Sequence, residues 1–101
     1  MEREEALVIL AQWCFTARSL AELQFMQGTE YISEIKCVHI LNPSANVYLI
    51  LPKAGHEETV NRLCLQNGLV RINEDSSSSF SFLETFRQRH QMLWDELLES
   101  M

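Results

Sequence analysis

The sequence predicts one α+β domain over residues 1–101, with a small curved sheet or an OB/SN-like partial barrel and flanking helices in the order α-β-β-α-β-α. The length of 101 residues suits a single core. Hydrophobic residues make up 47% and charged residues 22%, a globular balance that excludes disorder for the chain as a whole. Segments with helical and strand-like apolar patterns alternate between turn signals, which indicates a mixed fold.

The first segment, Glu2 to Met26, is expected to be one helix, because it contains no Gly or Pro and is acidic in its first turn. Its apolar residues form a stripe wider than one small core needs. A stripe of this width usually contacts a second surface. The sequence therefore predicts partner-binding residues on this helix: Leu10, Trp13, Ala17 and Phe25.

Two strands are expected next, and Gly28 is expected to end the first helix in the left-handed conformation. Thr29 to Leu41 is rich in β-branched and aromatic residues, and Asn46 to Leu51 repeats that composition. Asn42-Pro43-Ser44 is a turn signal between them. Apolar residues on both faces of both strands favour a sheet with helices packed outside it.

A short helix over Glu57 to Gln66 and a strand over Leu69 to Ile72 follow. The helix has an apolar face that includes Val60 and Cys64. The pair Asn67-Gly68 predicts a helix end with a left-handed glycine.

The C-terminal part is expected to be a flexible loop, Asn73 to Ser79, and then a helix from Phe82 to Met101. Ser81 and Glu84 fit the S-x-x-E capping box at its start. The serine-rich loop has two interpretations, a plain linker or a phosphorylation segment next to a helix N-terminus.

The charge and the cysteines restrict the class of protein. The net charge is −6 and the eight basic residues are scattered, so autonomous nucleic-acid binding is not expected. No apolar run approaches the ~20 residues of a membrane span, and no signal-peptide n-region precedes one. The three cysteines, Cys14, Cys37 and Cys64, are widely spaced and are expected to be buried thiols. These features predict a protein of a reducing compartment, cytoplasmic or nuclear and not secreted.

No catalytic set, metal site or cofactor site is expected, so the chain is predicted not to be an enzyme. His56-Glu57-Glu58 begins like a zinc-protease motif, but no second His follows at helical spacing. Cys37 and His39 share one side of a strand, an arrangement that also arises often by chance. His90 lies in the apolar stripe of the last helix and is expected to be a packed side chain.

The region from Trp13 to Ile72 resembles the staphylococcal-nuclease-like half of extended Tudor domains, a family of germ-granule proteins. The segments that carry the resemblance are Leu20-Ala21-Glu22-Leu23, Tyr31 to Val38, Asn46 to Leu49, and Val60 to Val70. The resemblance implies a barrel edge with helices that serves as a non-catalytic protein-interaction scaffold. It also implies a setting in small-RNA (piRNA) silencing, with a protein partner or a homodimer and a cytoplasmic, germ-granule location.

Two alternatives remain open at the level of sequence. The first is a small acidic homodimeric chaperone or adaptor that binds a partner polypeptide, on the evidence of length, acidity and fold class. The second is a degenerate nuclease or RNA-binding barrel, which predicts salt-sensitive binding of single-stranded nucleic acid.

Overall fold

The α+β class is confirmed by the computed structural model, which describes residues 3–72 and 76–99. The four strands form one open antiparallel sheet in the order β2-β3-β1-β4. Along the chain the elements are α1 (Arg3–Ala11), β1 (Cys14–Thr16), α2 (Leu20–Gly28), the 3₁₀ helix η1 (Thr29–Tyr31), β2 (Ile35–Asn42), β3 (Val47–Pro52), α3 (Glu57–Gln66), β4 (Val70–Arg71), α4 (Ser76–Arg89) and α5 (Gln91–Glu99).

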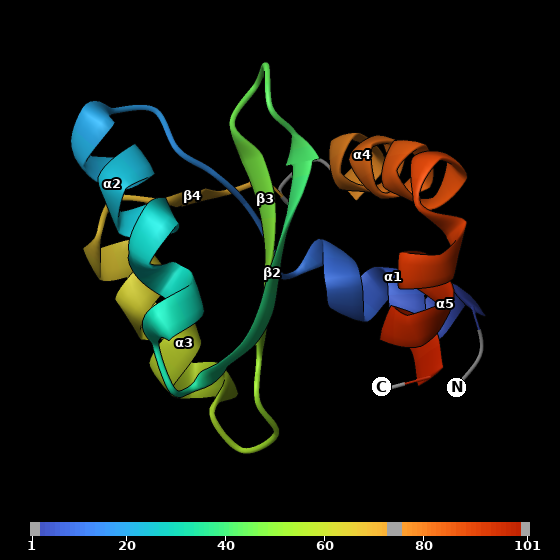
Figure 1. Ribbon diagram of the computed structural model, residues 1–101, viewed down its shortest axis with the longest axis horizontal. Coiled ribbons are helices and arrows are strands. Elements are labelled where there is room, and N and C mark those ends of the chain that lie inside the picture. The colour runs from blue at the N-terminus through green and yellow to red at the C-terminus, as the bar shows by residue number, and fades with distance from the viewer. Residues whose placement is uncertain (1–2, 73–75, 100–101) are drawn as a thin grey trace.

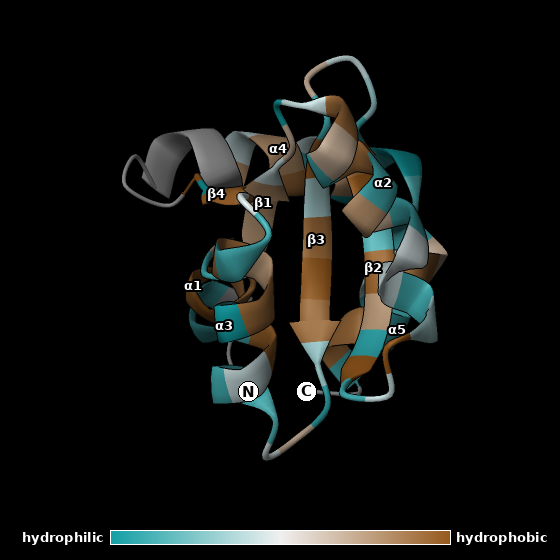
Figure 2. Cartoon of the chain, turned by 90° about the vertical axis from the view of Figure 1, so that its left-hand side faces the viewer, coloured by the Kyte–Doolittle hydropathy of each residue, from teal (hydrophilic) through white to brown (hydrophobic). Residues whose placement is uncertain are grey.

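The sheet is the middle of three layers. Figure 1 shows it nearly edge-on, with α2, η1 and α3 on one face and α1, α4 and α5 on the other. In the turned view of Figure 2 the strands show mostly apolar residues between these helices. Because both faces are covered, the core includes strand residues such as Phe15, Leu49 and Ile50 and helix residues such as Val60, Leu83 and Trp94.

The predicted single helix from Glu2 to Met26 is wrong, because a strand interrupts it. The last turn of α1 tightens as the Gln12 and Trp13 N–H groups donate to carbonyls three residues back. The chain then extends as β1, where Phe15 pairs with Tyr48 of β3 on one side and Arg71 of β4 on the other. Aromatic and β-branched residues suit such a strand, and here tertiary pairing outweighs helical spacing.

The second helix begins with a capping box that the sequence interpretation passed over. Ser19 Oγ accepts from the Glu22 N–H at 3.1 Å, and Glu22 Oε2 accepts from the Arg18 N–H at 2.8 Å. The first bond satisfies an N–H group that a helix start leaves without a partner, and the second ties Glu22 to the residue before the cap. Gly28 has φ −92°, so the predicted left-handed end is wrong there. The chain continues into η1, which takes the residues where the predicted strand began, and β2 starts only at Ile35.

The predicted helix Glu57 to Gln66 is confirmed, as are the strands around Val47 and Val70. Gly68 has φ +87°, which confirms the left-handed helix end.

The C-terminal prediction needs correction. Helix α4 begins at Ser76, so the loop prediction for residues 76–79 and the cap at Ser81 are wrong, while residues 73–75 of that loop lie outside the described residues. Glu84 instead accepts hydrogen bonds from the Arg87 guanidinium one turn away. The predicted single helix also divides at His90 into α4 and α5.

Ser19→Ala should lower the free energy of unfolding by about 1 kcal/mol, because it removes the side-chain cap of α2. Ser81→Ala is the matched control, since Ser81 is an exposed residue inside α4 and Ala favours helix. Urea denaturation of both variants measures the difference. Equal losses of stability in the two variants would contradict this assignment of the caps.

Gly68→Ala should be clearly more destabilising than Gly55→Ala, although both glycines have φ +87°. Each substitution should lower the free energy of unfolding by about 1–2 kcal/mol, because alanine is strained in the left-handed conformation. At Gly68 the new Cβ would also lie 2.9 Å from Glu22 Oε1, whereas at Gly55 it meets nothing within 4 Å. Glu22 is buried and holds the Arg18 N–H, so its displacement adds a further loss. Urea denaturation measures how much more unfolding free energy Gly68→Ala loses than Gly55→Ala. This difference should shrink when Glu22→Ala is also present, and an unchanged difference would rule out the contact with Glu22.

Candidate interaction surface

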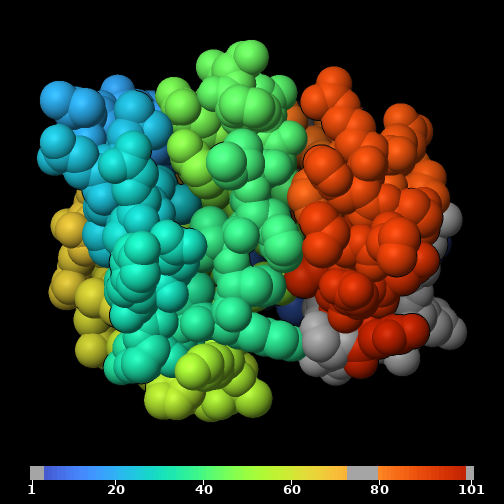
Figure 3. All heavy atoms as spheres, viewed as in Figure 1, coloured from blue at the N-terminus to red at the C-terminus, as the bar shows by residue number. Residues whose placement is uncertain are grey.

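Strand β2 is an open edge of the sheet. It pairs with β3 on one side, and no described strand lies on its other side. With eight residues it is the longest strand that the described ranges contain. Figure 3 shows this strand, in green, at the surface between α2 with η1 on one side and α4 with α5 on the other. Such an edge presents backbone N–H and C=O groups to which another extended chain can pair.

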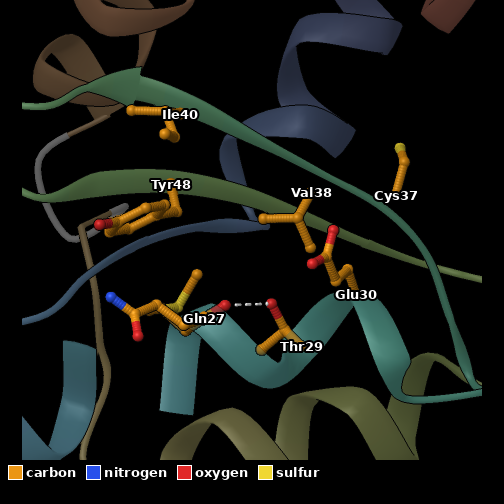
Figure 4. A pocket seen from close by; sticks show the side chains of 8 residues that line it. Gln27, Thr29, Glu30, Cys37, Val38, Ile40 and Tyr48 are labelled. Carbon is orange, nitrogen blue, oxygen red and sulfur yellow. Dashed lines mark hydrogen bonds between the residues drawn. The ribbon is translucent and has the colours of Figure 1, made fainter. Parts of the chain in front are cut away.

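A hollow of about 680 Å³ lies between this edge and the helical segment α2–η1. We call it the Glu30 hollow; it is lined by Met26, Gln27, Thr29, Glu30, Cys37, Val38, Ile40 and Tyr48. Figure 4 shows Val38 and Tyr48 on the sheet side and Thr29 and Glu30 on the helix side. The Thr29 hydroxyl donates to the Met26 carbonyl at 2.7 Å and is therefore engaged within the wall.

A second hollow, of about 310 Å³, borders the same strand next to α5. We call it the Leu93 hollow; it is lined by Lys36, Cys37, His39, Leu93, Glu96 and Leu97. Leu93 is 40% exposed, so an apolar side chain is open to solvent at this hollow.

The two hollows lie on opposite faces of the sheet, because α2 and η1 cover one face and α5 covers the other (Figure 1). Figure 4 shows the Val38 side chain on the side of Glu30 and the Cys37 side chain turned the other way. This is the alternation expected of consecutive strand residues. The edge strand β2 therefore has one hollow on each face of the sheet.

The four residues predicted to bind a partner do not form a surface. Leu10, Trp13 and Ala17 are buried in the core, and Phe25 is half-buried against it. These residues do not share one helix: Leu10 belongs to α1, Phe25 to α2, and the other two flank β1. The wide stripe predicted for a single helix therefore does not exist. The exposed apolar residue that lines the Glu30 hollow is Ile40, at 55% exposure, which the sequence interpretation placed within a strand but not at an edge.

The cysteines are free thiols, and burial raises the pKa of both Cys14 and Cys64 to about 12. Burial also raises the pKa of Cys37, the half-buried thiol that lines both hollows. A raised pKa disfavours the thiolate, which is the nucleophilic form. The Cys37–His39 arrangement therefore lacks the electrostatics of an activated cysteine.

Within residues 3–72 and 76–99, no group of three or more His, Cys, Asp or Glu side chains could hold a metal ion. Over the same described ranges, no helix has the length and apolar character needed to cross a membrane. His56 is the exposed N-cap residue of α3 and has no second histidine at helical spacing.

A chain of tilted ring contacts starts at His39, which lines the Leu93 hollow. The His39 ring centroid lies 5.4 Å from that of Phe86, and the Phe86 centroid lies 5.0 Å from that of His90. His90 is exposed by area, yet its ring packs on Phe86 at the break between α4 and α5. Burial lowers the pKa of His39, and the nearby His90 lowers it further.

Comparison of the chain with protein-family models, with curated proteins and with solved structures finds no match. The resemblance to the staphylococcal-nuclease-like half of extended Tudor domains therefore stays a prediction.

The free energy of unfolding should fall as the pH drops below about 6.5, the ordinary pKa of a histidine. The folded-state pKa of His39 lies below that value, so the unfolded chain binds the proton first and acid favours unfolding. His39→Phe keeps a ring against Phe86 and should flatten the slope of unfolding free energy between pH 7.5 and 5.5. His56→Gln leaves His39 in place and serves as the control. A slope unchanged by His39→Phe would contradict the assignment.

Proposed function

We propose that this domain is a non-catalytic protein-interaction module that binds a partner polypeptide as an added strand along β2. The observation that carries the proposal is the open eight-residue edge of β2, with a hollow on each face of the sheet. In strand addition, main-chain hydrogen bonds supply affinity and flanking spaces for alternate side chains supply specificity. Both requirements meet at this edge.

The charges favour a polypeptide over a nucleic acid as the occupant. The chain carries a net charge of −6, and each hollow contains a glutamate, Glu30 or Glu96. A phosphate backbone is bound through clustered Lys and Arg, and a carboxylate repels it. Among the residues that line the two hollows, Lys36 alone is a permanently cationic side chain.

The resemblance to extended Tudor domains supplies the proposed setting, a scaffold in small-RNA silencing within the cytoplasm or a germ granule. Three free thiols fit a reducing compartment. The homodimeric adaptor is the second proposal, because two copies of an open antiparallel edge can pair with each other.

The proposal is tested by selecting peptides from a random display library with the full chain and then measuring their affinity for two variants. Ile40→Lys places a charge at the exposed edge and should weaken binding at least about tenfold, since a charged edge residue opposes strand pairing. Leu65→Lys is the matched control, because Leu65 is 48% exposed on α3 and lines neither hollow. Its affinity should equal that of the natural chain.

Protection of Cys37 gives an independent readout. Cys37 is half-buried and lines both hollows, whereas Cys14 and Cys64 are buried. A bound strand should slow the reaction of this one thiol with a disulfide reagent. The proposal fails if no peptide is selected, or if binding ignores Ile40→Lys and leaves Cys37 reactive. Light scattering that shows a dimer, lost in Ile40→Lys, would favour the homodimeric adaptor instead.

A further inference from the structure

We infer that the segment recognised at β2 carries one basic and one apolar side chain an odd number of residues apart, the basic one in the Glu30 hollow and the apolar one in the Leu93 hollow. This inference rests on the proposed function and adds the chemistry of the partner. It follows from the positions of the two hollows and from the charges that line them.

The odd spacing follows from strand geometry. Side chains of an extended chain point alternately to opposite faces of the sheet. The Glu30 hollow lies on the face covered by α2 and η1, and the Leu93 hollow lies on the face covered by α5 (Figures 1 and 4). A strand added beside β2 therefore reaches the two hollows with residues at separations of one or three, and an even separation sends both side chains to one face.

The Glu30 hollow suits a basic side chain. Glu30 is its single formally charged residue, and in the described part of the chain its carboxylate has neither a hydrogen bond nor an ion pair. Val38 and Ile40 supply an apolar wall along which the stem of a Lys or Arg can lie. Such side chains bury their methylene stem while the charged head remains at a polar group.

The Leu93 hollow suits an apolar side chain. Leu93 and Leu97 line it from α5, and His39, whose ring packs against Phe86, lines it from β2. Lys36 and Glu96 carry opposite charges, so the lining gives no net preference for a charged occupant. It is also the smaller of the two spaces, at about 310 Å³ against about 680 Å³.

The net charge argues for a separate polypeptide over a second copy of this chain. Each copy carries −6, and two such copies repel each other as their edges approach. A segment with a Lys or Arg is attracted by the same field. The occupant that fits both the hollows and the overall charge is therefore a basic-apolar extended segment of another protein.

The test uses nine-residue peptides with blocked ends, made of threonine except for one Arg and one Leu separated by one, two, three or four positions. Fluorescence anisotropy with the full chain should show that separations of one and three bind about fivefold more tightly than two and four, the scale of one partly exposed contact. N-methylation of the alternate backbone nitrogens whose N–H groups face β2 should abolish binding of the best peptide, because strand pairing needs these donors.

Glu30→Gln should weaken binding of the best Arg peptide about fivefold and leave a matched Gln-for-Arg peptide unchanged. Glu5→Gln removes an exposed charge on α1, which lines neither hollow, and is the control. Equal affinity at odd and even separations, no effect of Glu30→Gln, or no binding by any peptide overturns the inference. The proposed function is decided separately by the library selection and its Ile40→Lys comparison.

Discussion

The architecture depends on three residues, Cys14 to Thr16, that form the strand β1 between β3 and β4. Backbone bonds extend this pairing on both sides, from the Ile50 N–H to the Trp13 carbonyl and from the Ile72 N–H to the Cys14 carbonyl. Phe15 is fully buried at its centre, with the Arg71 guanidinium 5.6 Å from its ring centroid. Without β1, strand β4 would have no partner and the β2–β3 hairpin would have two open edges. Because β1 occupies the inner edge of β3, the outer edge of β2 is the long one left for a partner.

An open edge is also a hazard, and the structure limits it. A long, flat, apolar edge promotes aggregation, and proteins counter this with lysines, bulges and neighbouring elements. Here β2 carries Lys36, and its pairing with β3 is irregular between Ile35 and Cys37 and again between Ile40 and Asn42. The helices on both faces form walls beside the strand (Figure 3). These features oppose stacking of whole sheets but leave room for a single narrow chain, which is the occupant that we propose.

The parts of the fold that the sequence predicts are those with strong local signals. Helix α3 has a clear apolar face and ends at Gly68, whose left-handed conformation few other residues adopt. Strand β1 lacked such a signal, because it has only three residues and lies between Trp13 and Ala17, which fit helical spacing. The segments Ser19-x-x-Glu22 and Ser81-x-x-Glu84 are equal as capping boxes, yet only the first follows a strand. Which one begins a helix depends on pairing with residues far away in the sequence.

The candidate site could not be predicted for a related reason. Whether β2 is an edge depends on the order of strands in the sheet, and no local pattern carries that order. The apolar stripe that first indicated a partner surface lies in the core, while the exposed groups at the two hollows have no distinctive sequence pattern. The Glu22 carboxylate accepts a hydrogen bond from the Arg18 N–H at the start of α2. This bond also lowers the pKa of Glu22. Glu30 has no such role, so its charge remains available to a ligand. The selectivity that we propose therefore arises from the fold, which places an uncommitted carboxylate and an apolar hollow on opposite faces of one open strand.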